Sequence, residues 1–426
     1  MAGCISQALR AWEIHFEEVL TMPAVQIKPD IYWIGVNDRT TDLFEGLWPI
    51  SREGVSYNAY LINDEKKALV DLAKGLKTDE FFANIAAIVE LSELDYVIVN
   101  HMEPDHTGVL RTLRQIAPDV TILGTPKTRE MLASFYGIAE KVKVVEDGET
   151  LPLGRRTLQF FHTPFVHWPE TMMTYETTHR ILFSCDAFGG YGALRGAIFD
   201  DEYPDLDFYQ KEALRYYVNI VAKFSKPVLR AIEKLSDVPV EIIAPSHGLI
   251  WRKRPDLIVE LYQRWARYAT GESEVGITLI YGSMYGNTEA MMNAVAHGIS
   301  RVGVPLEIFD AARVDVSYIL PSLWTKAGVM VGAPTYEGTL FPPVARVLEM
   351  AALKRVVNRK VAMFGSYGWS GGALRHLKKI VEPLKWELVD SLEFVGRPTE
   401  EELRRGEEFG ARFAELISRT EGDSGR

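Results

Sequence analysis

The sequence has few cysteines and no long run of apolar residues. Of its 426 residues only Cys4 and Cys185 are cysteines, which excludes a disulfide framework and any iron–sulfur or rubredoxin-type site held by thiolates. No apolar stretch approaches the roughly 18 residues of a membrane-spanning helix. An excess of positive charge is also missing, because the formal net charge is −11. We therefore expect no membrane and no nucleic-acid partner. With free thiols and no secretory signal, we expect a cytoplasmic location.

What the chain does have is length, enough for two domains. A polar break at residues 270–274 separates two halves whose patterns of apolar residues differ. We expect an N-terminal extension over residues 1–24, a first domain over 25–270 and a second over 275–420. Residues 421–426 are polar and are expected to form a flexible tail.

Histidines and carboxylates gather at one point of the first half. Residues 100–108 read Asn-His-Met-Glu-Pro-Asp-His-Thr-Gly, and they follow the apolar run 96–99, which predicts a buried strand. This places His101, Glu103, Asp105 and His106 on a loop at the end of that strand. A solvated polar turn is the alternative interpretation.

Three further strands end on residues that bind metals. His167 follows the strand expected at about 156–161, Asp186 ends the apolar run 181–185, and His247 follows the run 242–245. Four such endings in one region favour a metal centre over isolated loop residues. The candidate ligands are His101, Glu103, Asp105, His106, His167, Asp186 and His247. All their donor atoms are nitrogen or oxygen, which suits iron or manganese. His162 is a weaker candidate for a supporting role.

The order of expected elements gives a different fold for each half. The first half is rich in strands with interspersed helices, which predicts two sheets covered by helices. In the second half, strands expected at 276–281, 306–309, 328–331, 361–364 and 387–394 alternate with helical segments. This alternation predicts a parallel five-stranded sheet of order 2-1-3-4-5.

Three loops follow the carboxyl ends of the first, third and fourth of these strands. Hydroxyl groups and backbone N–H groups at the start of a helix can hold a phosphate without a cation. Aromatic side chains beside glycines can contact a flat ring. A plain glycine-rich turn is the alternative for any single loop, but three together predict FMN. The candidate residues are Ser283, Met284, Tyr285, Gly286, Asn287 and Thr288 in the first loop, Pro334, Thr335, Tyr336, Glu337, Gly338 and Thr339 in the second, and Ser366, Tyr367, Gly368, Trp369, Ser370, Gly371 and Gly372 in the third.

The spacing His-x-Glu-x-Asp-His resembles that of the metallo-β-lactamase superfamily, whose hydrolases carry His-x-His-x-Asp-His. With Glu103 in place of the second histidine, and with His167-Trp168-Pro169 and Asp186, the chain resembles the flavodiiron proteins (A-type flavoproteins). The likeness runs from about residue 27 to the last helix. It implies an α/β protein with a metallo-β-lactamase-like αββα sandwich followed by a flavodoxin-like doubly wound five-stranded parallel sheet.

The resemblance also implies roles for individual residues. One iron would take His101, Glu103 and His167, the other would take Asp105, His106 and His247, and Asp186 would bridge them. In some family members the residue matching His106 is held away from the metal.

Tyr216 and Tyr217 fall where the family often has tyrosines near the diiron pocket, and core packing is the alternative for both. Many members have asparagine where Glu337 stands. A carboxylate at that position disfavours the anionic reduced forms of the flavin.

The resulting hypothesis is an oxidoreductase in which FMN passes electrons to a non-haem diiron site that reduces O2 to water, NO to N2O, or both. The resemblance implies a head-to-tail homodimer, or a dimer of such dimers, and an external electron donor that is a rubredoxin-like protein or a reduced cofactor. One alternative is a zinc hydrolase of the metallo-β-lactamase type fused to a flavodoxin-like domain. Another is a redox carrier without catalytic activity.

Overall fold

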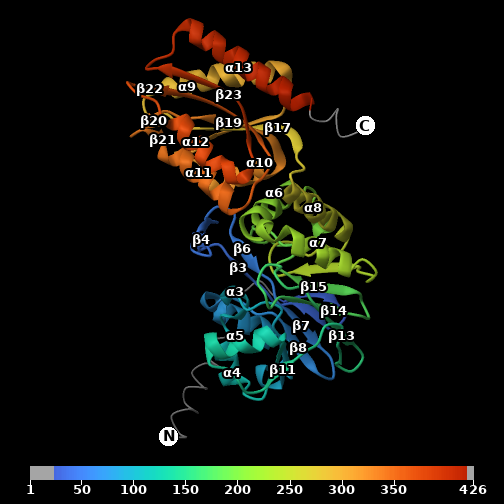
Figure 1. The fold of residues 1–426 in the computed structure, drawn as a ribbon. Helices are drawn as coiled ribbons and strands as arrows, with labels where there is room; N and C mark the ends of the chain where they lie inside the picture. The colour runs from blue at the N-terminus through green and yellow to red at the C-terminus, as the bar shows by residue number, and fades with distance from the viewer. Residues whose placement is uncertain (1–23, 420–426) are drawn as a thin grey trace. The chain divides into compact units, whose positions relative to one another are not determined.

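The computed structural model describes residues 24–419, which divide into two compact units (Figure 1). Unit 1 contains the described residues up to Tyr217 together with Lys226–Gln263, and unit 2 contains Val218–Ser225 and the residues from Arg264 onward. The extension predicted over 1–24, apart from residue 24, and the tail predicted over 421–426 lie outside the described residues.

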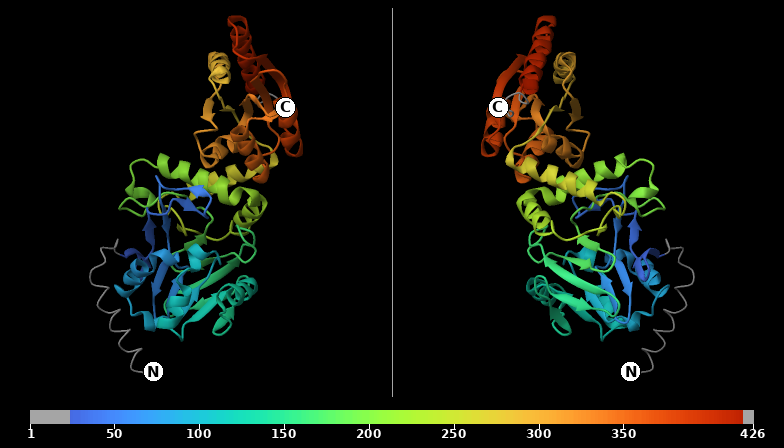
Figure 2. Two further views of the ribbon diagram at one scale, coloured as in Figure 1. Left: turned by 90° about the vertical axis from the view of Figure 1, so that its left-hand side faces the viewer. Right: turned by 90° about the vertical axis from the view of Figure 1, so that its right-hand side faces the viewer.

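Unit 1 contains two sheets packed face to face, which Figures 1 and 2 show as mainly blue-to-cyan strands against mainly green ones. The first sheet has the order β1 (Val25–Lys28), β2 (Ile31–Trp33), β7 (Tyr60–Asn63), β8 (Lys67–Val70), β9 (Tyr96–Ile98), β10 (Thr121–Gly124) and β11 (Val142–Val144). The second has the order β12 (Thr150–Pro152), β13 (Thr157–His162), β14 (Met172–Glu176), β15 (Ile181–Cys185) and β16 (Ile242–Pro245). Two further sheets have two strands each: β3 (Val36–Asp38) pairs with β6 (Val55–Tyr57), and the hairpin of β4 (Leu43–Phe44) and β5 (Trp48–Pro49) lies between them in the chain.

The two sheets contact each other through buried side chains. The Tyr60 ring of β7 lies 4.9 Å from the Phe183 ring of β15, and the Tyr60 hydroxyl donates a 2.7 Å hydrogen bond to the Pro245 carbonyl of β16. All residues of β14, β15 and β16 are buried, as expected for strands covered on both faces. The helices of this unit are α2 (Thr78–Ala86), α3 (Pro104–Thr107), α4 (Leu110–Ile116), α5 (Pro126–Tyr136), α6 (Asp207–Tyr216), α7 (Ser225–Lys234) and α8 (Pro255–Arg267).

Two details of unit 1 go beyond what the sequence predicts. The strands on either side of Asp147 and Gly148 belong to different sheets, so this turn carries the chain from the first sheet to the second. The ligand loop is also partly helical, because Asp105 and His106 lie on α3. Pro104 occupies the first turn of α3, where its fixed φ and missing N–H favour a helix start.

Unit 2 contains a five-stranded parallel sheet of order β18-β17-β19-β22-β23, which is the predicted order 2-1-3-4-5. Its strands are β17 (Glu274–Tyr281), β18 (Leu306–Asp310), β19 (Lys326–Gly332), β22 (Lys360–Tyr367) and β23 (Glu387–Val395). Its helices are α9 (Asn287–Val302), α10 (Val316–Thr325), α11 (Pro342–Leu353), α12 (Ala373–Val381) and α13 (Glu400–Ser418). The hairpin β20 (Thr335–Tyr336) to β21 (Thr339–Leu340) follows β19.

The helices of unit 2 cover both faces of its sheet, with α9 and α13 on one face and α10, α11 and α12 on the other (Figure 1). Helices α9 and α13 pack so closely that a Cβ atom at Gly298 would collide with the Glu407 carbonyl, and one at Gly410 with the Val295 carbonyl. Because helices cover both faces of this sheet, the loops at the carboxyl ends of its strands are where a ligand can bind. None of the helices within residues 24–419 is both long and apolar enough to span a bilayer.

Candidate metal centre and flavin site

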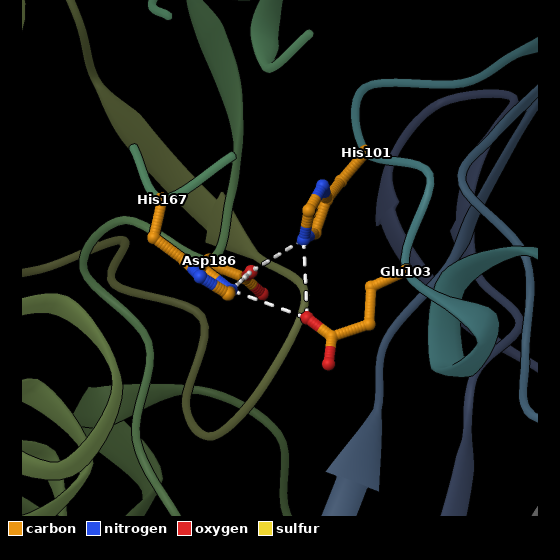
Figure 3. Close-up of side chains that lie close together, drawn as sticks. All are labelled: His101, Glu103, His167 and Asp186. Carbon is orange, nitrogen blue, oxygen red and sulfur yellow. Dashed lines mark hydrogen bonds and ion pairs between the residues drawn. The ribbon is translucent and has the colours of Figure 1, made fainter. Parts of the chain in front are cut away.

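Four side chains from separate parts of unit 1 point toward one spot (Figure 3). His101 Nε2 lies 3.2 Å from Glu103 Oε2 and 3.5 Å from Asp186 Oδ2. His167 Nε2 lies 3.2 Å and 3.1 Å from the same two oxygens. Two imidazole nitrogens and two carboxylate oxygens therefore surround a point where one cation fits.

A second group lies on the other side of Asp186. His106 Nε2 is 3.1 Å and His247 Nε2 is 3.3 Å from Asp186 Oδ1. Asp105 completes the group, with Oδ1 3.5 Å from His106 Nε2 and Oδ2 3.3 Å from His247 Nε2. Asp186 thus turns one oxygen to each group, which is the arrangement of a carboxylate that bridges two ions.

The groups fit a pair of divalent metal ions because their buried polar atoms lack other partners. His106 Nε2, His247 Nε2 and both oxygens of Asp105 and Asp186 are buried and form no hydrogen bond with any residue among 24–419. Such atoms cost free energy unless a ligand satisfies them. The donor set of nitrogen and oxygen atoms is the set that iron and manganese accept. All seven predicted ligands come together here, and iron binding by each of them stays a prediction.

The charges of this cluster hold protons on the histidines when no metal is present. Burial alone would lower the pKa of His101, but Glu103, Glu170 and Asp186 outweigh it and raise the pKa to about 10. Burial also lowers the pKa of His106, His167 and His247, but nearby carboxylates outweigh it. They raise the pKa to about 9 for His106 and His167 and to about 10 for His247. A dication entering the cluster replaces these protons.

A small cavity of about 260 Å³ leads to the ligands from the β4–β5 hairpin, and its lining includes Phe44, Glu45, Tyr57, Glu103 and Asp105. Burial, with a smaller contribution from the charge of Glu103, raises the pKa of Glu45 to about 7. The cavity suits a small molecule rather than an extended one.

The two predicted tyrosines have different surroundings. The Tyr216 ring lies 5.6 Å from the His247 ring, and its buried hydroxyl has no hydrogen-bond partner among the described residues. A π-helix begins immediately after it, a feature that often occurs at functional sites. The Tyr217 ring instead packs 5.0 Å from Tyr262, so the geometry assigns Tyr217 to the core.

Sequence reasoning missed several residues around the ligands. Phe44 and Tyr191 pack with Tyr216 beside His247, and Glu170 hydrogen-bonds His101. The sequence signal for Glu170 was its place three residues after His167. His162, the weaker candidate, lies outside the cluster and bonds the Val145 carbonyl through Nε2 at 3.0 Å.

The three predicted flavin loops meet at the carboxyl edge of the unit 2 sheet. The Thr288 hydroxyl of the first loop lies 3.2 Å from the Ser366 hydroxyl of the third. A Cβ atom at Gly372 would collide with the Gly338 carbonyl, so the backbone of the third loop lies directly against that of the second. The loops therefore form one continuous surface.

This surface fits a phosphate and a flat aromatic ring. The Ser283 hydroxyl accepts a 3.0 Å hydrogen bond from the Gly286 N–H, and Gly286 has a φ of 87°, which glycine adopts without strain. Backbone N–H groups at the start of the 16-residue helix α9 can bind an anion. Tyr285 and Trp369 are 90% and 94% exposed, which leaves two large rings free to contact a ligand.

Comparisons with known proteins agree with this arrangement. The profile of the ODP family beta lactamases matches residues 55–248, and the flavodoxin profile matches residues 279–410. A protein of Salmonella arizonae named anaerobic nitric oxide reductase flavorubredoxin is 36% identical over 397 residues, which cover 92% of this chain and 82% of that protein. A protein of the same name from Escherichia coli is 35% identical with the same coverage.

Solved structures show the same similarity along the whole chain. Rubredoxin oxygen:oxidoreductase from Desulfovibrio gigas superposes with a TM-score of 0.87 at 28% identity and covers 93% of this chain and 98% of that one. The flavodiiron protein of Giardia intestinalis has a TM-score of 0.87 at 29% identity, with 93% and 97% coverage. A flavoprotein of Thermotoga maritima has a TM-score of 0.84 at 32% identity, with 92% and 98% coverage. The predicted fold class is confirmed, and the chain belongs to the flavodiiron protein family.

Proposed function

We propose that this chain is an oxidoreductase that passes electrons from FMN to a pair of non-haem iron ions and reduces O2 to water, NO to N2O, or both. The observation that carries the proposal is the position of Asp186, whose two oxygens face two separate groups of ligands. The relatives named nitric oxide reductase and rubredoxin oxygen:oxidoreductase support the same chemistry.

Each part of the chain has a defined task in this proposal. His101, Glu103 and His167 would hold one iron, Asp105, His106 and His247 would hold the other, and Asp186 would offer one oxygen to each. When bound, FMN would supply the electrons and the irons would supply the redox chemistry of gas reduction. The loops starting at Ser283, Pro334 and Ser366 hold FMN through the phosphate-binding and ring-binding groups described above.

Tyr216 is the residue we assign to contact the reacting molecule. Burial raises the pKa of its phenol well above the ordinary value, so the hydroxyl stays protonated near neutral pH. A protonated phenol beside the ligands can donate a hydrogen bond to an oxygen atom of the substrate. Replacement by phenylalanine removes that donor and keeps the packing against Phe44 and Tyr191.

The alternative of a zinc hydrolase is less well supported. Glu103 places a negative charge where hydrolases of the superfamily have a neutral histidine, and negative ligands stabilise the ferric state. A flavodoxin-like unit also has no use in hydrolysis. Metal analysis distinguishes the two: about two irons per chain support our proposal, and zinc alone rejects it. Anaerobic single-turnover experiments with O2 and with NO then establish which gas is reduced faster.

We further propose a head-to-tail homodimer, or a dimer of such dimers, in which FMN of one subunit serves the irons of its partner. The boundaries 25–270 and 275–420, an external rubredoxin-like or small-molecule donor and a cytoplasmic location remain predictions from the sequence. A mixed dimer tests the arrangement, with Asp186→Asn in one subunit and Ser283→Ala plus Thr288→Val in the other. In this dimer one subunit keeps its FMN and the other keeps its irons. Electron transfer between subunits therefore leaves about one active FMN and iron combination per dimer, whereas transfer within a subunit leaves none.

A further inference from the structure

Glu170 lies in the loop between β13 and β14, which also carries His167, and its side chain hydrogen-bonds the candidate ligand His101. Its side chain is fully buried, and Oε1 accepts a 2.7 Å hydrogen bond from His101 Nδ1 and a 2.9 Å hydrogen bond from the Met102 N–H. Its backbone carbonyl accepts a 3.1 Å hydrogen bond from the Thr125 hydroxyl at the start of α5. Glu170 therefore joins the loop of His167 to the loop of His101.

The hydrogen bond from His101 has a chemical consequence for a metal held by that ring. With its proton on Nδ1, the imidazole presents the lone pair of Nε2 to the ion. A carboxylate acceptor draws the Nδ1 proton toward itself and leaves the ring richer in electrons than a neutral acceptor does. An electron-rich ligand stabilises the more positive oxidation state of the ion.

The corresponding histidine of the other group has a neutral acceptor. His247 Nδ1 lies 2.7 Å from the Ser56 carbonyl, which carries no net charge. The ligands themselves do not distinguish the two positions, because each has two histidines, one carboxylate of its own and one oxygen of Asp186. A buried carboxylate, Asp71, also lies near His106, but its hydrogen bonds go to Asn100 and Ser246. The difference between the positions thus lies in the layer behind the ligands.

We propose that Glu170 is a positioning residue that makes the two irons unequal: it stabilises the ferric form at the His101, Glu103 and His167 position. This inference rests on the proposed function, since it requires two irons in the cluster. The iron beside His101 then accepts its electron at a lower potential than the iron beside His247. Electrons from the flavin consequently occupy the His247 position first, and the His101 position is reduced last.

The test uses the intact FMN-containing enzyme and the variant Glu170→Gln, which keeps the size of the side chain and removes its charge. Redox titration followed by Mössbauer spectroscopy of iron-57 gives the two reduction steps and the signal of each iron. We expect the variant to bring the two steps closer by at least tenfold in equilibrium constant, which is about 59 mV for one electron. The signal altered by the variant must belong to the iron that is reduced last. The proposal is overturned if the difference between the two reduction potentials is unchanged, or if the altered signal belongs to the iron that is reduced first.

A matched control is Glu176→Gln. Glu176 is also a fully buried carboxylate in the second sheet, and it accepts hydrogen bonds from the Thr178 and His179 N–H groups instead of a ligand. Its replacement should leave both reduction steps unchanged. If Glu176→Gln shifts the iron reduction potentials as much as Glu170→Gln does, the effect comes from the general loss of a buried charge, and the specific role of Glu170 is overturned.

Two further results keep the test decisive. If Glu170→Gln binds no iron, Glu170→Asp, which keeps the charge, should restore iron and the wide spacing; failure to restore both overturns the proposal. If the parent enzyme itself contains zinc and no iron, the proposed function is rejected. An iron-loaded parent whose potentials do not respond to Glu170 rejects this inference alone.

Discussion

The metal centre and the flavin loops are built in opposite ways. His101, His106, Asp186 and His247 are at most 2% exposed, and their charges compensate one another before any metal enters. The flavin loops are exposed at Tyr285 and Trp369, and Glu337 is the one acidic residue among them. The metal site is therefore fixed by the packing of two sheets, whereas the flavin site is a surface that its ligand completes. Each of the following experiments affects one site and leaves the other as its internal reference.

The largest effect is expected for Asp186→Asn. Asp186 turns one carboxylate oxygen to the histidines of each group, and asparagine cannot provide two negative oxygens. Iron content should fall below one per chain, and gas reduction should fall by at least about a hundredfold, in line with the loss of a key electrostatic group. FMN should stay bound. The measurements are iron analysis, flavin absorbance and oxygen or nitric oxide consumption.

The exposed ion pair between Asp147 and Lys234 provides the control for this experiment. Asp147→Asn removes an equal charge from unit 1 and should change neither iron nor activity. Normal iron content and normal turnover in Asp186→Asn would refute the bridging role of this carboxylate.

The second effect concerns the flavin alone. The double variant Ser283→Ala plus Thr288→Val removes two hydroxyl groups from the first loop, and each neutral hydrogen bond contributes about 0.5–1.5 kcal/mol. FMN affinity should therefore fall by about ten- to a hundredfold. Equilibrium dialysis measures this loss, and iron content should not change. Ser418→Ala removes a hydroxyl from the end of α13 and serves as the control. Unchanged FMN affinity in the double variant would exclude this loop from the site.

The third effect is a dependence of metal binding on pH. Without metal, the pKa values of His101 and His247 are raised to about 10, so both rings are protonated at pH 7. Iron must displace these protons, and its apparent affinity should rise between pH 7 and pH 10 with measurable proton release. Chelator competition at several pH values and a pH indicator in weak buffer measure the two quantities.

The same pKa shifts affect the stability of the metal-free protein. A raised folded-state pKa contributes stability that is complete below the ordinary histidine value of 6.5 and is lost as the pH rises through about 10. Unfolding of the metal-free protein should therefore become easier toward alkaline pH. FMN affinity should not follow this trend, because the flavin loops contain no such histidine. A metal affinity that falls with rising pH would contradict the charge pattern of the cluster.

The metal centre and the flavin loops also differ in the sequence pattern that predicts them. The grouping of the candidate ligands was predictable because each stands at or shortly after the end of an apolar strand, and strand ends of packed sheets converge. The flavin loops were predictable because a βα alternation places them at one edge. Glu170 was not, since its contact with His101 joins residues 69 positions apart and depends on how the two sheets stack.

Tertiary contacts determine what local signals leave open. The turn at Asp147 and Gly148 connects two sheets because Val142–Val144 pairs in parallel with β10 in the first sheet, whereas β12 belongs to the second. Tyr216 and Tyr217 are adjacent and chemically identical. The helix places one beside His247 and the other against Tyr262, and this choice depends on the register of α6 in the folded protein.

The smallest effect is expected for Glu337→Asn in the turn between β20 and β21. Glu337 and Gly338 have φ values of 47° and 73°, and asparagine tolerates this left-handed conformation better than glutamate. The variant should stabilise unit 2 by about 0.5–1 kcal/mol.

Loss of the carboxylate should also raise the reduction potential of the flavin slightly, because a negative charge beside the ring opposes the anionic reduced form. Solvent screens this exposed side chain, which keeps the shift below that produced by a buried charge. Thermal unfolding and spectroelectrochemistry measure the two changes. Iron content and the iron potentials should remain as in the parent enzyme, since Glu337 belongs to the flavin surface. An unchanged flavin potential would show that the charge of Glu337 does not act on the ring, and a lowered potential would contradict the predicted direction.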